Sequence, residues 1–388
     1  MNHHYDAIVV GGRCAGAATA MLLARGGMRV LVIDASRPGT DTLSTHALMR
    51  GGVLQLHRWG LLDDVVAAGT PAIRSTEFVY GDEIETVDIR PGGGISALRA
   101  PRRTVLDPLL LEAARAAGAE VRTPARVMRV LTEGGRVYGV EGIERGTGTR
   151  FRAAAPLVIG ADGRNSTIAH AVDAPFRRRG VESGAVVYGY FPGLPRDRYH
   201  WAYRPGFAGG VIPTGDGLAC VWAGTASTRF ARERRTSLDA TFRWLLAEAD
   251  PRLARAISAT SPVGTLRADP GRPGWVRAST GPGWALVGDA AYLKDPITAH
   301  GITDALRDAE LLADAVLDTP VGRRARSDAL TDYERIRDRL ATPLFDVTER
   351  IASYAWDLDV LRGHLRDLSQ AMRPEIDALL AIDQTPAA

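Results

Sequence analysis

The sequence of 388 residues contains only two cysteines, Cys14 and Cys220, and a single lysine, Lys294. Two cysteines provide neither a disulfide framework nor a metal-binding spacing, and they fit a reducing compartment, so we expect a cytoplasmic protein. No apolar run approaches the ~18 residues of a membrane-spanning helix, and no basic and apolar leader precedes the first predicted strand. We therefore expect neither stable membrane insertion nor secretion.

A strong net charge is absent as well. The formal net charge is +3, and all but one of the 48 basic residues are arginines. The densest basic run, 177–179, lies between strand-like segments, which favours a solvated turn over a nucleic-acid patch. With 45% apolar and 24% charged residues, the composition is that of a globular protein with one large domain or two coupled ones. No nucleic-acid partner is expected.

The first pattern in the chain is an alternation of strand, turn and helix. An apolar run at Asp6–Val10 leads into a glycine-rich turn at Gly11–Gly16, a helix over 17–25 and a second buried strand at Arg29–Ile33. Asp34 closes that second strand. Strand, glycine-rich turn, helix, strand and acid in this order are typical of the opening βαβ unit of a dinucleotide-binding sheet.

The turn departs from the usual G-x-G-x-x-G pattern because Arg13 occupies the middle glycine position. One interpretation is a phosphate-binding turn in which Arg13 adds positive charge and Asp34 accepts hydrogen bonds from an adenosine ribose. The alternative is an ordinary strand-to-helix turn that holds no ligand. The acid at the end of the second strand favours the first interpretation.

The middle of the chain changes character. Residues 76–98 read as a hairpin, and 13 of the 25 aromatic residues fall between 176 and 275, where short strands are predicted. The pattern of a buried strand returns at Trp284–Val287. We predict an α/β nucleotide-binding domain interrupted by an antiparallel-sheet substrate domain. The nucleotide-binding parts are 1–75, 99–175 and 276–330, the substrate parts are 76–98 and 176–275, and a helical segment follows at 331–388.

Two acids stand directly after buried strands. Asp162 precedes Gly163, a common turn pair on its own, and Asp289 follows Gly288. Beyond Asp289 come a loop and a helix starting near Gly301, whose apolar residues recur at spacings of three and four. An acid past a strand, together with a helix N-terminus, suits a ligand with hydroxyls on one side and developing negative charge on the other.

These segments resemble the flavoprotein aromatic hydroxylases and their neighbours, the geranylgeranyl reductase-like and flavin-dependent halogenase groups. The resemblance is carried by VVGGRCAGAATAMLLARGG at 9–27, GADGRNS at 160–166 and GDAAYLKDPITAHG at 288–301. Two shorter segments, beginning at Arg50 and Arg103, resemble family segments whose arginines contact FAD. The resemblance implies a Rossmann-type FAD-binding domain with an inserted antiparallel-sheet substrate domain and a C-terminal helical tail.

The resemblance also implies a tightly held, non-covalent FAD. Asp289 would bind the ribityl chain, Asp162 would serve a motif tied to FAD and NAD(P)H, and the loop at 296–302 would lie near the flavin ring. The residues implied in cofactor binding are Gly11, Arg13, Cys14, Ala15, Gly16, Asp34, Arg50, Arg103, Asp162, Gly288, Asp289, Gly301 and Ile302.

The implied reaction is a monooxygenation. NADPH or NADH, bound transiently, reduces the flavin, O2 adds at its C4a carbon, and the resulting hydroperoxide hydroxylates an aromatic or polyketide-type small molecule. The alternatives are an FAD-dependent reductase of prenyl double bonds, a halogenase, and a non-catalytic escort protein on the same fold. The sequence does not fix the oligomeric state.

The candidate catalytic residues are Lys294, His46 and Pro296. A buried lysine can move protons, although a solvated place at the rim of the loop is the plainer interpretation of Lys294. His46 could act as an acid or base, or simply pack as a core or capping histidine. The candidate substrate-binding residues are His200, Trp201 and Tyr203, which could equally be ordinary core and surface of a strand.

Overall fold

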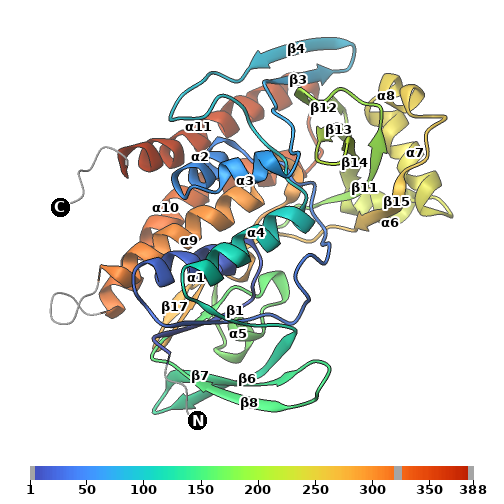
Figure 1. Ribbon diagram of the computed structural model, residues 1–388. Helices are drawn as coiled ribbons and strands as arrows, with labels where there is room; N and C mark the ends of the chain where they lie inside the picture. The colour runs from blue at the N-terminus through green and yellow to red at the C-terminus, as the bar shows by residue number, and fades with distance from the viewer. Residues whose placement is uncertain (1–4, 319–325, 383–388) are drawn as a thin grey trace.

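The computed structural model describes residues 5–318 and 326–382, so the parts of the predicted domains at 1–4, 319–325 and 383–388 lie outside the described residues. The predicted α/β fold with antiparallel sheets and C-terminal helices is confirmed (Figure 1). Within the described ranges, no helix is both long and apolar enough to cross a lipid bilayer.

Strands and helices alternate in the first part of the chain, and helices alone form its last part. The strands are β1 (Ala7–Val10), β2 (Val30–Ile33), β3 (Ser75–Tyr80), β4 (Glu83–Asp88), β5 (Glu120–Arg122), β6 (Ala125–Glu133), β7 (Arg136–Glu144), β8 (Arg150–Ala154), β9 (Val158–Gly160), β10 (Phe176–Arg179), β11 (Gly184–Pro192), β12 (Arg198–Arg204), β13 (Phe207–Pro213), β14 (Leu218–Ala226), β15 (Val263–Asp269), β16 (Trp275–Arg277), β17 (Thr280–Gly281), β18 (Trp284–Leu286) and β19 (Tyr292–Leu293). The α-helices are α1 (Cys14–Arg25), α2 (Arg50–Arg58), α3 (Leu62–Ala67), α4 (Arg103–Ala116), α5 (Thr167–Ala171), α6 (Ser227–Glu233), α7 (Leu238–Ala249), α8 (Pro251–Ala256), α9 (Gly301–Leu317), α10 (Arg326–Ala352) and α11 (Leu358–Ile382).

A six-stranded sheet of order β17-β18-β9-β1-β2-β5 carries the first βαβ unit, and all its strands except the edge strand β17 run parallel. Side chains of β1 alternate across it. Ala7 and Val9 face α1, α4 and α9, whereas Ile8 and Val10 face α5 and the three-stranded sheet β6-β7-β8, which Figure 1 places below. Because both faces are covered, the strands are continuous apolar runs, as the sequence predicted.

A second large sheet has the order β15-β11-β14-β13-β12-β3-β4. The predicted hairpin over 76–98 forms β3 and β4, and β3 joins β12 as its parallel neighbour. Because side chains alternate along strands, the buried tyrosine and tryptophan rings collect on one side, which packs toward the nucleotide-binding unit. The helices α7 and α8 cover the other side. We call this side the aromatic face; it comprises Tyr188, Tyr190, Tyr199, Trp201, Tyr203 and Trp222.

The helices α10 and α11 form the C-terminal part of the described chain. The helix α11 packs against α10 and α2, as Figure 1 also shows. Its buried residues include Leu361, Leu368 and Leu379, which anchor it to the same hydrophobic cluster as α1 and α9. The last helix is therefore an integral part of the core.

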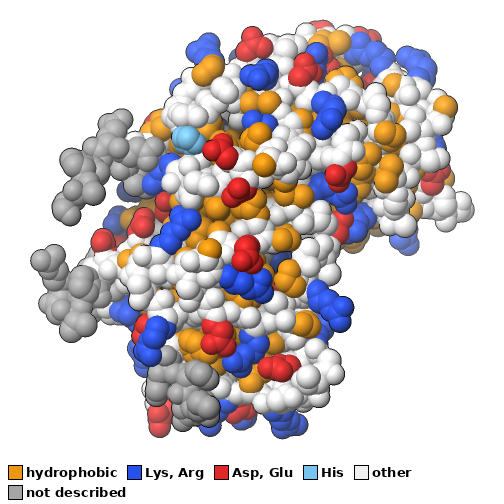
Figure 2. Space-filling model, viewed as in Figure 1, with side chains coloured by type: hydrophobic (Ala, Val, Ile, Leu, Met, Phe, Trp, Pro, Cys, Tyr) orange, Lys and Arg blue, Asp and Glu red, His pale blue; other side chains and the backbone are white. Residues whose placement is uncertain are grey.

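Arginines on the surface are largely balanced by neighbouring carboxylates. On the face shown in Figure 2, basic and acidic side chains are interspersed. The basic run at 177–179, predicted as a solvated turn, is instead the exposed strand β10. Arg177 pairs with Glu334 and Arg178 with Asp346, both from α10. The strand was not predicted, because three arginines in succession show no alternation of apolar and polar residues.

Candidate cofactor and active site

The turn between β1 and α1 is built on obligatory glycines. Gly11 has φ +106°, and a Cβ there would stand 2.3 Å from the Ala161 carbonyl oxygen. A Cβ on Gly16 would stand 1.9 Å from the Gly11 carbonyl oxygen. The helix α1 begins at Cys14 without a side-chain cap and without an acid in its first turn. Its first amides are therefore free to bind an anion such as a phosphate group.

Asp34 lies at the end of β2, beside this turn. Its Oδ2 accepts a hydrogen bond of 2.6 Å from the Gly12 amide, and its Oδ1 accepts one of 2.6 Å from the Ser36 amide. The carboxylate forms part of an open pocket between β2, α1 and α4. The pocket is lined by Gly12, Arg13, Asp34, Ser36, Arg37, Pro38, Gly39, Thr40, Asp107 and Leu111. A nucleoside beside Asp34 would place its phosphates near the free amides of α1.

Asp107, in the first half of α4, orders the positive charges around α1. It is buried and accepts hydrogen bonds from Arg13 Nη1 at 2.9 Å, from Arg103 Nε at 2.8 Å and from Cys14 Sγ at 3.2 Å. Burial raises the pKa of the Cys14 thiol well above its usual range, so the thiol stays protonated. The structure thus brings together Arg13, Cys14 and Arg103, three of the predicted cofactor-binding residues.

Asp289 follows β18 at the same carboxyl edge of the parallel sheet. Gly288 has φ +61°, and a Cβ there would lie 2.8 Å from the Ala15 Cβ, so this glycine lets the acid approach α1. Burial raises the pKa of Asp289, although Arg103 and Lys294 oppose the shift. Within the described residues, the Asp289 carboxylate makes no hydrogen bond. It is therefore available to a ligand.

The N-terminus of α9 lies close to this acid in the chain and in space. The residue before the helix, His300, does not cap it with its side chain. A Cβ on Gly301 would meet no atom within 4 Å, so the first turn of α9 borders open space. The uncapped amides of Gly301 and Ile302 can stabilise negative charge on a ligand that occupies this space.

The side chains of two other predicted cofactor residues form hydrogen bonds within the protein. The Asp162 carboxylate accepts hydrogen bonds from the Ser166 hydroxyl and from the Thr167 amide at the start of α5. The Arg50 guanidinium binds the backbone carbonyl oxygens of Arg90 and Gly92 in the loop after β4. Asp162 lies beside the β1–α1 turn, since a Cβ on Gly11 would stand 2.9 Å from the Asp162 backbone nitrogen, and the turn after Asp162 contacts the turn that holds Asp289. The roles of Asp162 and Arg50 toward FAD and NAD(P)H stay predictions.

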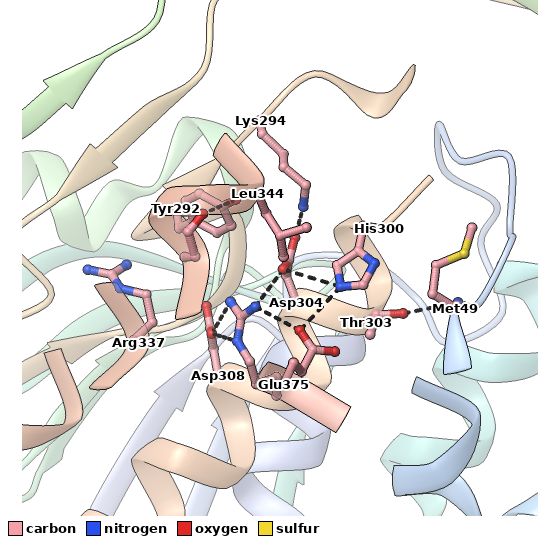
Figure 3. A network of polar contacts seen from close by, with 12 residues as sticks. Met49, Tyr292, Lys294, His300, Thr303, Asp304, Asp308, Arg337, Leu344 and Glu375 are labelled. Atoms are coloured by element: carbon pink, nitrogen blue, oxygen red, sulfur yellow. Dashed lines mark hydrogen bonds and ion pairs between the residues drawn. The ribbon is translucent and has the colours of Figure 1, made fainter. Parts of the chain in front are cut away.

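Lys294 is buried rather than solvated at the rim of its loop. Its ammonium group forms an ion pair with Asp304 of α9 (Figure 3). Burial, together with nearby Arg307, lowers the pKa of Lys294 to about 7. A lysine with such a pKa can gain or lose a proton near neutral pH, so Lys294 stays a candidate for proton transfer.

The ion pair belongs to a buried network that joins α9 to α11. Arg307 donates to Asp304 Oδ1 at 2.8 Å, to Asp308 Oδ1 at 2.7 Å and to Glu375 Oε2 at 3.0 Å. His300, Asp304 and Glu375 lie close enough to suggest a metal site. The Arg307 guanidinium, however, already lies between the two carboxylates where a metal ion would have to bind. We therefore interpret the cluster as an ionic network.

His46 lies in the segment between β2 and α2, with a left-handed backbone conformation of φ 71°. Its Nε2 shares a hydrogen bond with the Tyr190 hydroxyl, and its Nδ1 is buried with no partner in the described chain. Burial and nearby arginines lower the pKa of His46 to about 3, so the ring is neutral. A neutral histidine in a left-handed conformation with a free ring nitrogen stays a candidate for the site.

Pro296 begins a single 3₁₀ turn, Pro296–Thr298, in the loop before α9. The neighbouring Asp295 carboxylate accepts hydrogen bonds from the Gly184 amide at 2.6 Å and from the Ile297 amide at 2.9 Å. Since Gly184 begins β11, this loop is tied directly to the sheet that carries the aromatic face.

The three predicted substrate residues do not share one side of the sheet. Trp201 and Tyr203 belong to the aromatic face. His200 points to the opposite side, where it bonds Glu77 Oε1 and Asp250 Oδ2, each at 2.7 Å. Alternation along β12 forces this separation, so His200 is placed to hold α8 against the sheet.

Comparison with known proteins adds the chain's family. The family model described as FAD binding domain matches residues 4–348. The chain belongs to this family. It is therefore an FAD-dependent oxidoreductase, and the escort hypothesis is withdrawn.

Relatives in the FAD-binding family differ in their reactions. Menaquinone reductase of Mycolicibacterium smegmatis is 28% identical over 86% of this chain and 79% of its own. The 6-methylpretetramide 4-monooxygenase of Streptomyces rimosus is 27% identical over 99% of this chain and 90% of its own. The crystal structure of a probable FAD-dependent monooxygenase of Pseudomonas aeruginosa has a TM-score of 0.78 at 22% identity, covering 94% of this chain and 100% of that one. The last comparison supports the fold alone.

The residues present fit the cofactor of the family. The free amides of α1, the unpartnered Asp289 carboxylate and the open space beside Gly301 provide places for the phosphates, for hydroxyl groups and for a ring that gains negative charge. Sequence reasoning gave no role to three residues of the candidate site. Asp107 had a signal in its spacing of four from Arg103, whereas Tyr190 and Glu375 meet partners too distant in the chain for any local pattern.

Proposed function

We propose that the protein is an NAD(P)H-consuming FAD monooxygenase that hydroxylates an aromatic or polyketide-type small molecule. The observation that carries the proposal is the attachment of the aromatic face to the segment between β2 and α2. Tyr190 bonds His46, and the Tyr188 hydroxyl accepts a hydrogen bond of 3.1 Å from the Ser44 amide. Rings that pack well against flat aromatic substrates thus border the predicted flavin side of the molecule.

The cofactor would be held by the residues described above. The α1 amides and Arg13 suit the pyrophosphate, Asp34 the adenosine ribose, and Asp289 the ribityl hydroxyls. When bound, FAD supplies two-electron redox chemistry and, with O2, the transfer of one oxygen atom. The protein must exclude water and orient the substrate, and the packed rings of the aromatic face serve both needs.

His46 is our candidate for binding the substrate hydroxyl. Burial raises the pKa of Tyr190, so its hydroxyl stays protonated and can donate a hydrogen bond to His46 Nε2. In this neutral tautomer Nδ1 carries the ring proton and can donate a hydrogen bond to a substrate oxygen. The left-handed backbone at His46 would then hold a donor in place for the substrate.

A second candidate is the reduction of an isoprenoid double bond. Menaquinone reductase and the digeranylgeranylglycerophospholipid reductase of Methanosarcina mazei are similar to this chain at 28% and 27% identity. Their names indicate substrates with long apolar chains. The aromatic face would suit such chains less well than it suits flat rings, so we rank this reaction second.

The two candidates differ in their demand for oxygen. Purified protein would be incubated with NADPH or NADH and a set of phenolic and polyketide aromatics, with and without O2. We expect an aromatic to stimulate cofactor oxidation and to gain one oxygen atom by mass spectrometry. Anaerobic turnover of a prenyl substrate, with no stimulation by any aromatic, would contradict the proposal and favour the reductase.

A further inference from the structure

His300 and Glu375 form a buried pair at the N-terminus of α9. His300 Nε2 lies 3.2 Å from Glu375 Oε2 and 3.9 Å from Asp304 Oδ1. Since a carboxylate can only accept, Nε2 carries the ring proton of the neutral histidine. Nδ1 is buried and has no partner within the described residues. Figure 3 shows His300 directed at Glu375 and Asp304. The lone pair of Nδ1 is thus the free position of the ring, and His300 lies one residue before Gly301, which borders open space.

The charged groups around His300 carry a net negative charge that one more proton would neutralise. Asp304 and Arg307 come from α9, Glu375 from α11 and Lys294 from the preceding loop. Counting Asp308, which pairs with Arg307, three carboxylates face two cations when the histidine is neutral. A protonated His300 would balance the network. Burial lowers the pKa of His300, and the Glu375 carboxylate offsets part of that shift.

Glu375 reaches this place because the neighbouring helix leaves a gap for it. A Cβ on Gly51 of α2 would stand 2.3 Å from Glu375 Oε1, so a larger residue there would force the carboxylate to shift. Although burial raises it, the pKa of Glu375 falls to about 2 because His300 and Arg307 favour the charged form. The family model ends at residue 348, before α11 begins. The acid that holds His300 is therefore contributed by a helix outside the matched region.

We propose that His300, held by Glu375, takes up one proton from solvent at Nδ1 when FAD bound at the N-terminus of α9 is reduced. The inference rests on the proposed placement of FAD. Two electrons and one proton enter the flavin from the reductant, which is either NAD(P)H or dithionite together with water. One further proton binds His300 Nδ1 and forms the imidazolium. The driving force is electrostatic, because negative charge gained by the flavin beside Gly301 favours a positive charge on the adjacent residue.

The test is the number of protons taken up per two electrons. The midpoint potential of bound FAD would be measured between pH 6 and 8, and its slope with pH gives this number. We expect two protons for the unmodified protein and the loss of one in His300→Gln. Glu375→Gln, which keeps the hydrogen bond but removes the charge, should lower the number toward one. The exposed His170 provides the control, and His170→Gln should retain two.

Three results would overturn the inference. One is a count of one proton in the unmodified protein. Another is a count of two in His300→Gln, which would place the second proton on a different group, such as the flavin or Lys294. If His300→Gln does not fold, the unmodified protein and Glu375→Gln still decide, because an unchanged count of two in Glu375→Gln excludes His300 as the acceptor. Hydroxylation is not part of this measurement, so a failure of the proposed monooxygenase reaction would be seen separately.

Discussion

Asp289 holds a carboxylate that no described residue binds. If this acid binds the ribityl hydroxyls, Asp289→Ala should lose several hydrogen bonds to FAD, each worth about 1 kcal/mol or more. We expect the variant to purify with little or no flavin, as measured by its absorbance near the flavin bands. The exposed acid Asp63 of α3 gives a control, because Asp63→Ala should keep its flavin. A fully flavinated Asp289→Ala would remove Asp289 from the site.

His200 should make stability depend on pH. Although burial opposes the charged form, hydrogen bonds to Asp250 and Glu77 raise the pKa of His200 above 6.5. Its contribution to the free energy of unfolding is therefore complete below pH ~6.5, the pKa of an unfolded histidine, and is lost as the pH rises through the raised value of the folded state. We expect His200→Gln to lose roughly 2 kcal/mol at pH 6 and much less at pH 9.

Urea unfolding of both proteins at several pH values measures this difference. His364→Gln is a useful comparison, because burial lowers the pKa of that histidine and its effect should have the opposite sign. If the loss in His200→Gln were the same at pH 6 and pH 9, His200 would stabilise the protein by packing rather than by its charge.

At the scale of elements, β4 is an exposed edge strand. All six of its residues are exposed, including the apolar Ile84 and Val87. Replacing both with lysine should change the free energy of unfolding by less than about 0.5 kcal/mol and should reduce self-association, since charged side chains protect sheet edges. Val79→Lys on the adjacent strand β3 is the matched control, because Val79 is buried and its replacement should prevent folding.

Chemical denaturation and light scattering would measure the two effects. A large loss of stability in the double variant would mean that β4 is covered in solution, for example by another protein chain. Increased scattering of the double variant would contradict the argument from edge protection.

Elements differed in how well the sequence predicted them. The strand at Ala7–Val10 and the helix from Gly301 carry strong periodic patterns and were found. The basic strand β10 was not, because its residues carry no apolar alternation. Contacts between residues that are distant in the chain could not be predicted from the sequence. No residue near Glu375 indicates that it meets His300, because this contact depends on the packing of α11 against α2. The burial of Lys294 was missed for the same reason.

For the whole molecule, we expect FAD to stabilise both large sheets together. One hydrophobic cluster contains residues of β1, α1 and α9 as well as the aromatic face. At a free FAD concentration of about 100 times its Kd, the cofactor should add ~2.7 kcal/mol to the free energy of unfolding. Removing FAD should therefore lower Tm in one transition. Tryptophan fluorescence, to which all seven tryptophans contribute, among them Trp201 and Trp222 of one sheet and Trp284 of the other, should follow the same curve as circular dichroism.

Two separate transitions would contradict this expectation and would indicate that the sheets unfold independently. The matched control is titration of the Asp289→Ala variant with FAD, which should leave its Tm unchanged.

Because β3 pairs with β12, which lies much later in the chain, β3 is synthesised well before the strand it pairs with. Ser75 pairs with Arg198, so the hairpin β3–β4 leaves the ribosome long before its partner strand. At about 5–20 residues per second, the interval is on the order of ten seconds. Throughout that interval Val79, buried in the finished protein, has no sheet to cover it. The nascent chain should therefore depend on chaperones at this stage, and slow codons between the two strands should lower the yield of soluble protein.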